Sequence, residues 1–381
     1  MTMGGGWMYN KTKKALCAEG ESMTYDLVII GAGPAGATLA RELAAGSPTL
    51  RIALIDGAAA GVPKVCGGLL SEDAQALMAK MGLTLPREVL ADPQIFAVET
   101  IDLGRSLART YVRNYINMDR LAFDRWLISL IPESVEIIEG RCAEISRTGG
   151  GFRLSLRTSG GMLELHSERV VGAEGASSLT RRTLFDKGIY KYVSIQQWFE
   201  NSDTSLPPYS CIYDRATSDS CSWTVRKGKY FIFGGAFAAQ GCRAAFEAQR
   251  KRLEEYLGRS LGTPAITEAC QVCSPRRGSD FLTGSDGAYL IGEAAGFISA
   301  SSFEGISSAM LSAHLLSEAI LAGGNDERRV ARLYRKLTRP LRRKLKLKIP
   351  KMRILSSPSL RYLIMKSGVT SIEKYQYVNK S

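Results

Sequence analysis

The sequence has little histidine, no regular cysteine spacing and no long hydrophobic run. Only two of its 381 residues are histidines, and its eight cysteines follow no framework. This usage disfavours a histidine-rich metal site and a disulfide-stapled scaffold, so we expect no metal and reduced thiols, as in the cytoplasm. No apolar run approaches the length of a transmembrane helix. Residues 1–22 lack the apolar centre of a signal peptide, and we expect them to be a disordered extension or to precede the true start at Met23.

Acidic residues are absent from residues 328–353, which hold 13 of the 50 Lys and Arg residues. The other 37 basic residues balance 37 acidic ones, so the formal charge of +13 belongs to one segment. Aliphatic residues recur there at roughly helical spacing, which predicts a basic amphipathic helix interrupted at Pro340. Such a helix either lies on anionic lipid or packs on the body of the protein. Its interleaved residues are aliphatic rather than aromatic, which disfavours nucleic acid.

A chain of this length can bury a large core, and we expect two domains. Near the start, a β-forming apolar run over residues 25–30 leads into Gly31-x-Gly33-x-x-Gly36. A small-residue helix and a second apolar run ending at Asp56 follow, which completes a βαβ unit. Gly33 has no Cβ and lets the backbone approach phosphates at the helix N-terminus, while Asp56 can accept hydrogen bonds from ribose hydroxyls. The unit predicts a dinucleotide site but does not distinguish FAD from NAD.

Two further segments have alternative interpretations. Cys66-Gly67-Gly68 either lies close to a flavin ring or forms a tight turn with a buried cysteine. Arg120 lies in the first turn of a predicted helix, where the helix dipole disfavours a cation. It either meets a cofactor phosphate or forms a surface ion pair with Asp124.

The middle of the chain is rich in β-forming residues. We expect residues 135–166 to form a meander, with a separate strand over 169–172. Residues 192–235 predict an antiparallel sheet whose inner face covers a flat or apolar ligand, or forms an ordinary core. Cys270 and Cys273 have redox-motif spacing, but without a second pair or a nearby histidine they do not predict a metal site.

A third glycine-rich segment follows a buried strand over residues 288–291. Gly292 and Glu293 come directly after this strand, and Glu293 can bind a polyol hydroxyl. Gly305 and Ile306 begin a long helix, whose N-terminus would stabilise the negative charge of a reduced flavin. His314, within this helix, is interpreted as a packing residue.

Together these motifs resemble the FAD-dependent oxidoreductases of the aromatic-hydroxylase fold. The three signals are Gly31-x-Gly33-x-x-Gly36, Gly172-Ala173-Glu174-Gly175 and Gly292-Glu293-Ala294-Ala295-Gly296, in that order. Within this group the sequence is similar to the geranylgeranyl reductase family, and in that family to the CbrA-type proteins of bacteria.

The resemblance implies an α/β (α+β) fold, FAD as the cofactor and a set of site residues. It implies a discontinuous Rossmann-type FAD-binding domain (23–75, 116–185 and 275–325), an antiparallel-sheet substrate domain (76–115 and 186–274) and a basic helical C-terminal segment (326–381). The implied cofactor-binding residues are Gly31, Gly33, Ala35, Gly36, Asp56, Cys66, Gly67, Gly68, Arg120, Cys142, Gly175, Gly292, Glu293, Gly305 and Ile306. Cys66 and Trp223 are the implied catalytic residues.

The sequence departs from the family at three points. Glu174 and Glu293 replace aspartates, and the longer side chains should still reach the cofactor. Trp223 is retained from the family's substrate motif, but its flanking Tyr, Phe and Pro are not.

The resulting prediction is an FAD-dependent reductase of carbon–carbon double bonds in an isoprenoid lipid or another apolar small molecule. The alternatives are a flavin monooxygenase or halogenase, or a non-catalytic lipid-binding flavoprotein. The electron donor is left open between NAD(P)H, ferredoxin and flavodoxin. We expect a cytoplasmic protein with peripheral contact to an anionic membrane through Arg328–Arg353, and no nucleic-acid partner.

Overall fold

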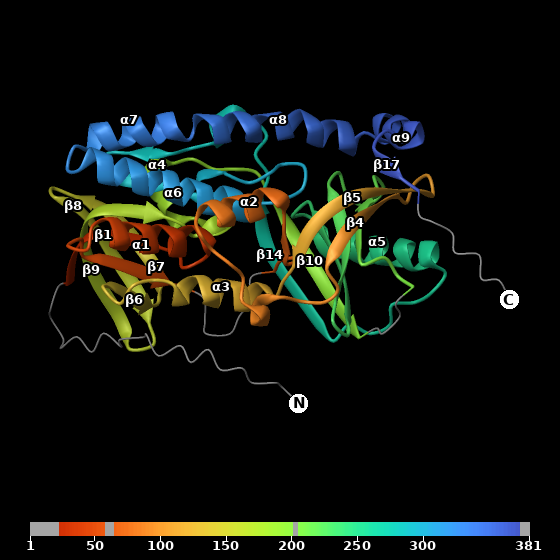
Figure 1. The fold of residues 1–381 in the computed structure, drawn as a ribbon, viewed down its shortest axis with the longest axis horizontal. Helices are drawn as coiled ribbons and strands as arrows, with labels where there is room; N and C mark the ends of the chain where they lie inside the picture. Colours follow the sequence, from red (N-terminus) through yellow and green to blue (C-terminus); the bar gives the residue numbers. More distant parts are fainter. Residues whose placement is uncertain (1–22, 58–64, 201–204, 374–381) are drawn as a thin grey trace.

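The computed structural model describes residues 23–57, 65–200 and 205–373. The predicted extension over residues 1–22 lies outside them. Two sheets stand side by side, and helices run along their shared upper edge (Figure 1). This mixed arrangement confirms the predicted α/β (α+β) class.

The first sheet is a parallel sheet in the strand order β6-β2-β1-β9, with the short strand β16 beyond β9. Residues 27–30 of β1 and 52–55 of β2 are continuous apolar runs, which is typical of parallel strands that are covered on both faces. Val28 and Ile29 of β1, for example, have no exposed surface. The bounds are β1 Met23–Ile30, β2 Ile52–Asp56, β6 Val135–Glu139, β9 Gly161–Gly172, β15 Gly284–Ser285 and β16 Ala288–Leu290.

The predicted meander over residues 135–166 is wrong at its first strand, whereas its other three strands pair antiparallel as expected. Its first strand, β6, pairs in parallel with β2, so it belongs to the parallel sheet. Only β7 (Arg141–Thr148), β8 (Gly151–Thr158) and the first half of β9 form antiparallel pairs. The separate strand expected at 169–172 is the second half of β9, which continues without a break to pair with β1. A single long strand can pair with different strands along its length, and no local sequence pattern shows where the partner changes.

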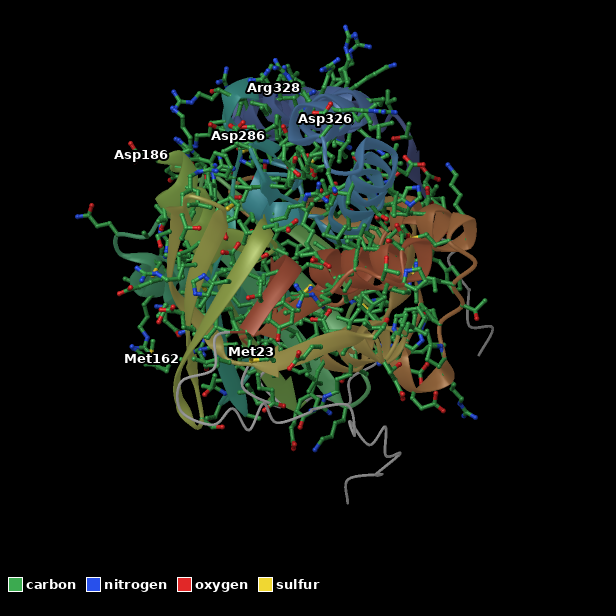
Figure 2. All side chains as sticks on the ribbon, turned by 90° about the vertical axis from the view of Figure 1, so that its left-hand side faces the viewer. Met23, Met162, Asp186, Asp286, Asp326 and Arg328 are labelled. Carbon is green, nitrogen blue, oxygen red and sulfur yellow. The ribbon has the colours of Figure 1, made fainter. Side chains whose placement is uncertain are left out.

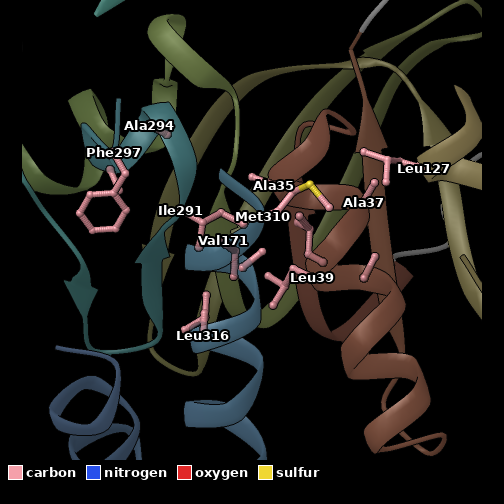
Figure 3. Close-up of a cluster of buried hydrophobic side chains, with 14 of the residues drawn as sticks. Ala35, Ala37, Leu39, Leu127, Val171, Ile291, Ala294, Phe297, Met310 and Leu316 are labelled. Carbon is pink, nitrogen blue, oxygen red and sulfur yellow. The ribbon is translucent and has the colours of Figure 1, made fainter. Parts of the chain in front are cut away.

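Helix α1 (Pro34–Gly46) packs beside α6 (Ile306–Gly323), and small residues allow their close approach. Figure 3 shows Ala35 and Leu39 of α1 close to Met310 of α6, with Val171 of β9 beside them. All four side chains are buried. The remaining helices near this core are α2 (Glu72–Lys80), α3 (Arg120–Ser129) and α4 (Leu179–Phe185).

By length and composition, α6 is the one helix in the described ranges that could span a membrane, although no such run was expected from the sequence. Met310, Ala313 and Leu316 on this helix are completely buried. It therefore serves as a core helix between α1 and α7.

The second sheet has the strand order β14-β10-β13-β12-β11-β4-β5-β17, and β3 pairs with β5. Helix α5 (Cys242–Leu257) covers one face, where Phe246 stacks on Phe233 at 5.1 Å between ring centroids. The strands are β3 Leu69–Leu70, β4 Ile95–Asp102, β5 Leu107–Asn117, β10 Lys191–Glu200, β11 Tyr209–Tyr213, β12 Cys221–Lys227, β13 Tyr230–Phe237, β14 Ile266–Cys273 and β17 Ser371–Ile372.

The basic C-terminal segment forms three helices, α7 (Glu327–Leu337), α8 (Arg339–Ser356) and α9 (Pro358–Ser367). The predicted interruption is present, because α7 ends before Thr338 and Pro340 occupies the first turn of α8. Apolar residues of α7 and α8, among them Val330 and Leu345, belong to the core of the first sheet. Helices α7 and α8 therefore pack on the body, and most of their basic residues face outward.

Candidate functional site

Three glycine-rich turns meet at one edge of the first sheet, beyond the carboxyl ends of neighbouring strands. In the pairing register, Ile30 of β1 lies beside Gly172 of β9, which lies beside Leu290 of β16. The turns that follow carry the predicted residues Gly31, Gly33, Ala35 and Gly36, then Gly175, then Gly292 and Glu293. Asp56 ends β2 on the other side of β1. This edge is where open α/β sheets bind ligands.

The three glycines of the first motif have different physical roles. Gly36 is packed so tightly that an added Cβ would lie 1.9 Å from the carbonyl oxygen of Gly31. Gly31 itself has a φ of +109° and faces Ala173 of the second motif. A Cβ on Gly33 would meet no described atom within 4 Å. Gly33 therefore leaves open space at the N-terminus of α1, which fits a pyrophosphate at that helix end.

Glu174 of the second motif is hydrogen-bonded to residues at the start of α4. Its carboxylate accepts hydrogen bonds from the backbone N–H of Thr180 (2.9 Å), the Thr180 hydroxyl (2.6 Å) and the Ser178 hydroxyl (2.8 Å). These bonds satisfy the N-terminus of α4. Glu174 therefore holds the start of α4 in place, and its predicted contact with the cofactor remains a prediction. Gly175, with a φ of +67°, forms the turn beside it.

The third motif is tied to both neighbouring layers. The Gly292 N–H donates to the Ser312 hydroxyl of α6 at 2.9 Å. A Glu293 oxygen accepts the N–H of Cys273 on β14 at 2.8 Å. Glu293 thus joins the first sheet to the end of the second sheet. Its predicted contact with a polyol or pyrophosphate remains a prediction.

The N-terminus of α6 faces the second sheet. Gly305 is the N-cap residue and Ile306 the first helical residue. Phe303, just before them, has a φ of +55°, which is unusual for a bulky residue and is typical of functional turns. The first N–H groups of α6 are therefore presented at the junction of the two sheets, which suits an anionic ring edge.

Cys66 and Arg120 meet at the same junction. The Cys66 sulfur accepts the N–H of Gly68 at 3.4 Å, and the Arg120 guanidinium lies close enough to the Cys66 side chain to interact with it electrostatically. Arg120 also pairs with Asp124 at 2.9 Å. Burial lowers the pKa of Arg120, but Asp124 and Cys66 outweigh it and raise the pKa above its ordinary value. The predicted ion pair with Asp124 is present. The positive charge of the Arg120 guanidinium also lies near the Cys66 thiol.

Lys227 is a residue that the sequence motifs did not single out. Its ammonium donates to Asn117 Oδ1 at 2.6 Å and to the carbonyls of Met118 (2.6 Å) and Gly68 (3.2 Å). Burial lowers the pKa of Lys227 to about 8. This lysine of β12 fastens the segment Cys66-Gly67-Gly68, which we call the Cys66 loop, to the end of β5. Its place just before a glycine turn was its only local signal.

Trp223 lies next to the Cys66 loop. A Cβ added to Gly67 would be 3.8 Å from the indole nitrogen, and one added to Gly234 would be 2.7 Å away. The two glycines make room for the ring. The indole N–H is buried and has no hydrogen-bond partner among the described residues. Cys66, Gly67, Gly68, Arg120 and Trp223, predicted from separate segments, therefore form one cluster.

The inner face of the second sheet, which carries Trp223 and looks toward α6, is more polar than expected. Because side chains alternate along a strand, Phe231, Phe233 and Phe237 point to the opposite face and pack on α5. The inner face also carries Tyr209, Cys211, Tyr213 and Cys221. Most of the phenylalanines that suggested an apolar cover therefore belong to an ordinary core.

Tyr115 and Glu304 form a second unpredicted contact at this junction. The Tyr115 hydroxyl donates to the Glu304 carboxylate, and the Tyr115 ring packs edge-on against Tyr209 at 5.6 Å. Burial and the neighbouring carboxylate raise the pKa of Tyr115 well above its ordinary value. The sequence motifs singled out neither residue as a partner of the other, because 189 residues separate them in the chain.

The remaining predicted cysteines lie at the rim of the glycine-rich edge. Cys142 on β7 is close to Glu174, and burial raises its pKa to about 12. Cys270 contacts the Val65 carbonyl at 3.8 Å, while Cys273 meets Glu293. Because Cys270 and Cys273 are three residues apart on one strand, their side chains point to opposite faces, which is unsuitable for a disulfide.

Solved structures with this architecture belong to FAD-dependent enzymes. A geranylgeranyl bacteriochlorophyll reductase-like protein from Thermoplasma acidophilum aligns with a TM-score of 0.78 at 15% identity, covering 94% of each chain. PqsL, a probable FAD-dependent monooxygenase from Pseudomonas aeruginosa, aligns with a TM-score of 0.68 at 19% identity, covering 91% of this chain and 99% of PqsL. A family model, Lycopene cyclase protein, matches residues 26–190.

Fold and glycine-rich edge together define a protein of the FAD-binding Rossmann-type monooxygenase and reductase fold. The structural neighbours with this fold are FAD-dependent enzymes, which supports the predicted cofactor, FAD. In sequence the chain is 44% identical over 354 residues to Protein CbrA of Escherichia coli O6:H1, covering 91% of this chain and 94% of that protein. The chain belongs to the CbrA family.

Proposed function

We propose that this chain is an FAD-dependent reductase that acts on a carbon–carbon double bond of an isoprenoid lipid or its phosphate. The observation that carries the proposal is the cluster of Cys66, Arg120 and Trp223 opposite the N-terminus of α6. One similar structure and one matching family model have names that concern isoprenoid compounds. They are the geranylgeranyl bacteriochlorophyll reductase-like protein and the lycopene cyclase family. This supports an isoprenoid substrate.

In this proposal the glycine-rich edge holds FAD. The α1 N-terminus beside Gly33 takes the pyrophosphate, and Asp56 binds the adenosine ribose. Gly292 and Glu293 bind the ribityl chain or the pyrophosphate, and Gly305 with Ile306 meets the ring. When bound and reduced, FAD supplies the hydride that is added to one carbon of the double bond.

The chain itself supplies the proton for the other carbon. The Cys66 thiol is the proposed donor, and the thiolate left behind would be stabilised by the nearby Arg120 guanidinium and by the Gly68 N–H that hydrogen-bonds the sulfur. Solvent then returns the proton. Trp223 and the tyrosines of the inner face would cover the substrate, and their hydroxyls suit a lipid with a polar group near the reacting bond.

The test uses the full chain with bound FAD under anaerobic conditions. The flavin is reduced photochemically, and prenyl diphosphates, polyprenyl phosphates and carotenoids are added one at a time. Return of the oxidised-flavin absorbance together with a product two hydrogens heavier would support the proposal. Cys66→Ala should keep its FAD and slow this step by about 10²-fold or more, whereas Cys242→Ala, on α5, should not.

Two results would contradict a reductase. If no lipid re-oxidises the flavin although lipid binds, the chain is a non-catalytic lipid-binding flavoprotein. If oxygen is consumed in step with an oxygenated or halogenated product, it is a monooxygenase or halogenase, and the polar inner face would then hold an aromatic substrate. Supplying NAD(P)H, reduced ferredoxin or reduced flavodoxin in place of light identifies the electron donor.

A further inference from the structure

The buried residues of helix α9 are Arg361 and Met365, and three of its large apolar residues are exposed. Its buried face carries Arg361, which is 3% exposed and pairs with Asp102 at 2.9 Å. Its outer face carries Leu360, Leu363 and Ile364, which are 47%, 62% and 45% exposed. A soluble helix normally places such residues the other way round. The outer face of α9 therefore lacks the cover that its composition calls for.

Further exposed apolar residues precede and follow α9 along the chain. Seven of the 15 large hydrophobic residues that are exposed among the described residues lie between positions 347 and 372. We call these seven the apolar patch: Leu347, Ile354, Leu360, Leu363, Ile364, Val369 and Ile372. On α8, Leu347 and Ile354 are seven residues apart and so share one face of the helix. Clustered exposed apolar residues mark an interaction surface, whereas single ones do not.

A cationic surface continues from this patch along the same edge. Seven basic side chains of α7 and α8 line an open hollow, without an acidic residue among them. Figure 2 shows nitrogen-tipped side chains projecting from this edge near Arg328, at the start of α7, and Figure 1 shows α7, α8 and α9 in one row. The residues of this basic hollow are Arg332, Arg335, Lys336, Arg339, Arg342, Arg343 and Lys346.

The two surfaces together fit one kind of partner. A negatively charged surface reduces the mutual repulsion of the seven cations. Hydrocarbon removes the side chains of the apolar patch from water. An anionic bilayer offers both along one plane, with headgroups for the basic hollow and the acyl boundary for the patch. A second copy of this chain would bring seven further cations to the same edge. Charge complementarity therefore favours the bilayer.

We propose that the edge formed by α7, α8 and α9 docks on an anionic phospholipid bilayer. Leu360, Leu363 and Ile364 enter the headgroup and acyl boundary, and the basic hollow contacts the phosphates. The stripe of α7 and α8 that resembled a membrane-binding face packs in the core instead. The lipid-facing apolar residues are those of the patch, most of which lie after Arg353. This inference does not depend on which reaction the flavin site catalyses.

The experiment is flotation of the full chain with phosphatidylcholine vesicles, with and without phosphatidylglycerol. Binding should require the anionic lipid and weaken as salt is raised. The apolar variant, Leu360→Ser with Leu363→Ser and Ile364→Ser, should bind at least 10-fold less well. The basic variant, Lys336→Gln with Arg339→Gln and Arg343→Gln, should bind about 100-fold less well. All six residues are exposed, so both variants should fold, which their FAD content and thermal unfolding would verify.

Control variants carry the same kinds of change at exposed positions elsewhere. Met162→Ser removes an exposed apolar residue of β9, and Arg153→Gln with Arg157→Gln and Arg243→Gln removes three exposed cations of β8 and α5. Both controls should float like the wild type. Equal binding by all variants, or equal binding to neutral vesicles, would overturn the proposal. It would also be overturned if the wild type bound DNA in preference to vesicles, or if it were a dimer that the apolar variant converts to monomers.

Discussion

The Tyr115 hydroxyl donates a hydrogen bond to the Glu304 carboxylate, and this contact joins the two halves of the molecule. Tyr115 lies near the end of β5 in the second sheet. Glu304 directly precedes Gly305, which is the N-cap residue of α6, a helix that packs in the core of the first sheet. The position of the α6 N-terminus relative to the inner face therefore depends in part on one tyrosine.

Replacing this tyrosine should loosen the junction. Tyr115→Phe leaves a carboxylate without its donor, and we expect the free energy of unfolding to fall by about 1–3 kcal/mol. Urea denaturation measures this loss. Because the α6 N-terminus is then less firmly held, the absorbance spectrum of bound flavin should also shift. Tyr111→Phe, on the same strand, is the control, and an equal effect of both variants would refute a specific role for Tyr115.

Two glycines of the first motif should respond differently to alanine. Gly36→Ala places a methyl group 1.9 Å from a carbonyl oxygen, so we expect about 3 kcal/mol or more of destabilisation. Gly33→Ala meets no described atom and has an ordinary φ of −71°, so the fold should be kept. Its FAD affinity should fall by about 10- to 100-fold, because the methyl displaces a charged hydrogen-bond acceptor. Thermal unfolding and FAD titration separate these outcomes. Normal FAD binding by Gly33→Ala would contradict the proposed position of the pyrophosphate beside Gly33.

Lys227 should give the stability a distinct dependence on alkaline pH. Its pKa is about 8 in the folded chain and 10.5 in the unfolded chain, so the unfolded state binds more protons between these values. The free energy of unfolding should therefore rise with pH across this window, by up to about 3 kcal/mol. Lys227→Met should lack this rise. Urea denaturation of both proteins at pH 7, 9 and 10.5 makes the comparison, and parallel curves would contradict it.

The buried pair of Arg361 and Asp102 should be costly to break from one side. Asp102 is 1% exposed, so Arg361→Met leaves an unpaired buried carboxylate and should destabilise the protein by about 3–5 kcal/mol. Adding Asp102→Leu should restore most of this loss. Equilibrium unfolding in urea measures both variants. Arg353→Met removes an exposed cation of α8 and should change stability by about 0.5 kcal/mol at most.

The glycine motifs could be predicted from the sequence because each is a local pattern. A strand, a tight turn and a helix N-terminus require particular residues at fixed spacing, and the turns at Gly31 and Gly292 lie where that spacing placed them. The strand pairing of residues 135–172 could not be predicted in the same way. Both β6 and β9 have ordinary β-forming sequences, and their parallel partners are remote in the chain.

What the sequence alone determined is the class of cofactor site, together with the residues of the Cys66 loop and the basic character of the C-terminal segment. Only the tertiary structure decided that Glu174 caps α4, that Lys227 and Tyr115 hold the junction, and that α9 buries its arginine and exposes its leucines. The physical reason is range. Backbone turns and charge runs are properties of neighbouring residues, whereas burial and long-range hydrogen bonds exist only once distant strands and helices have packed together.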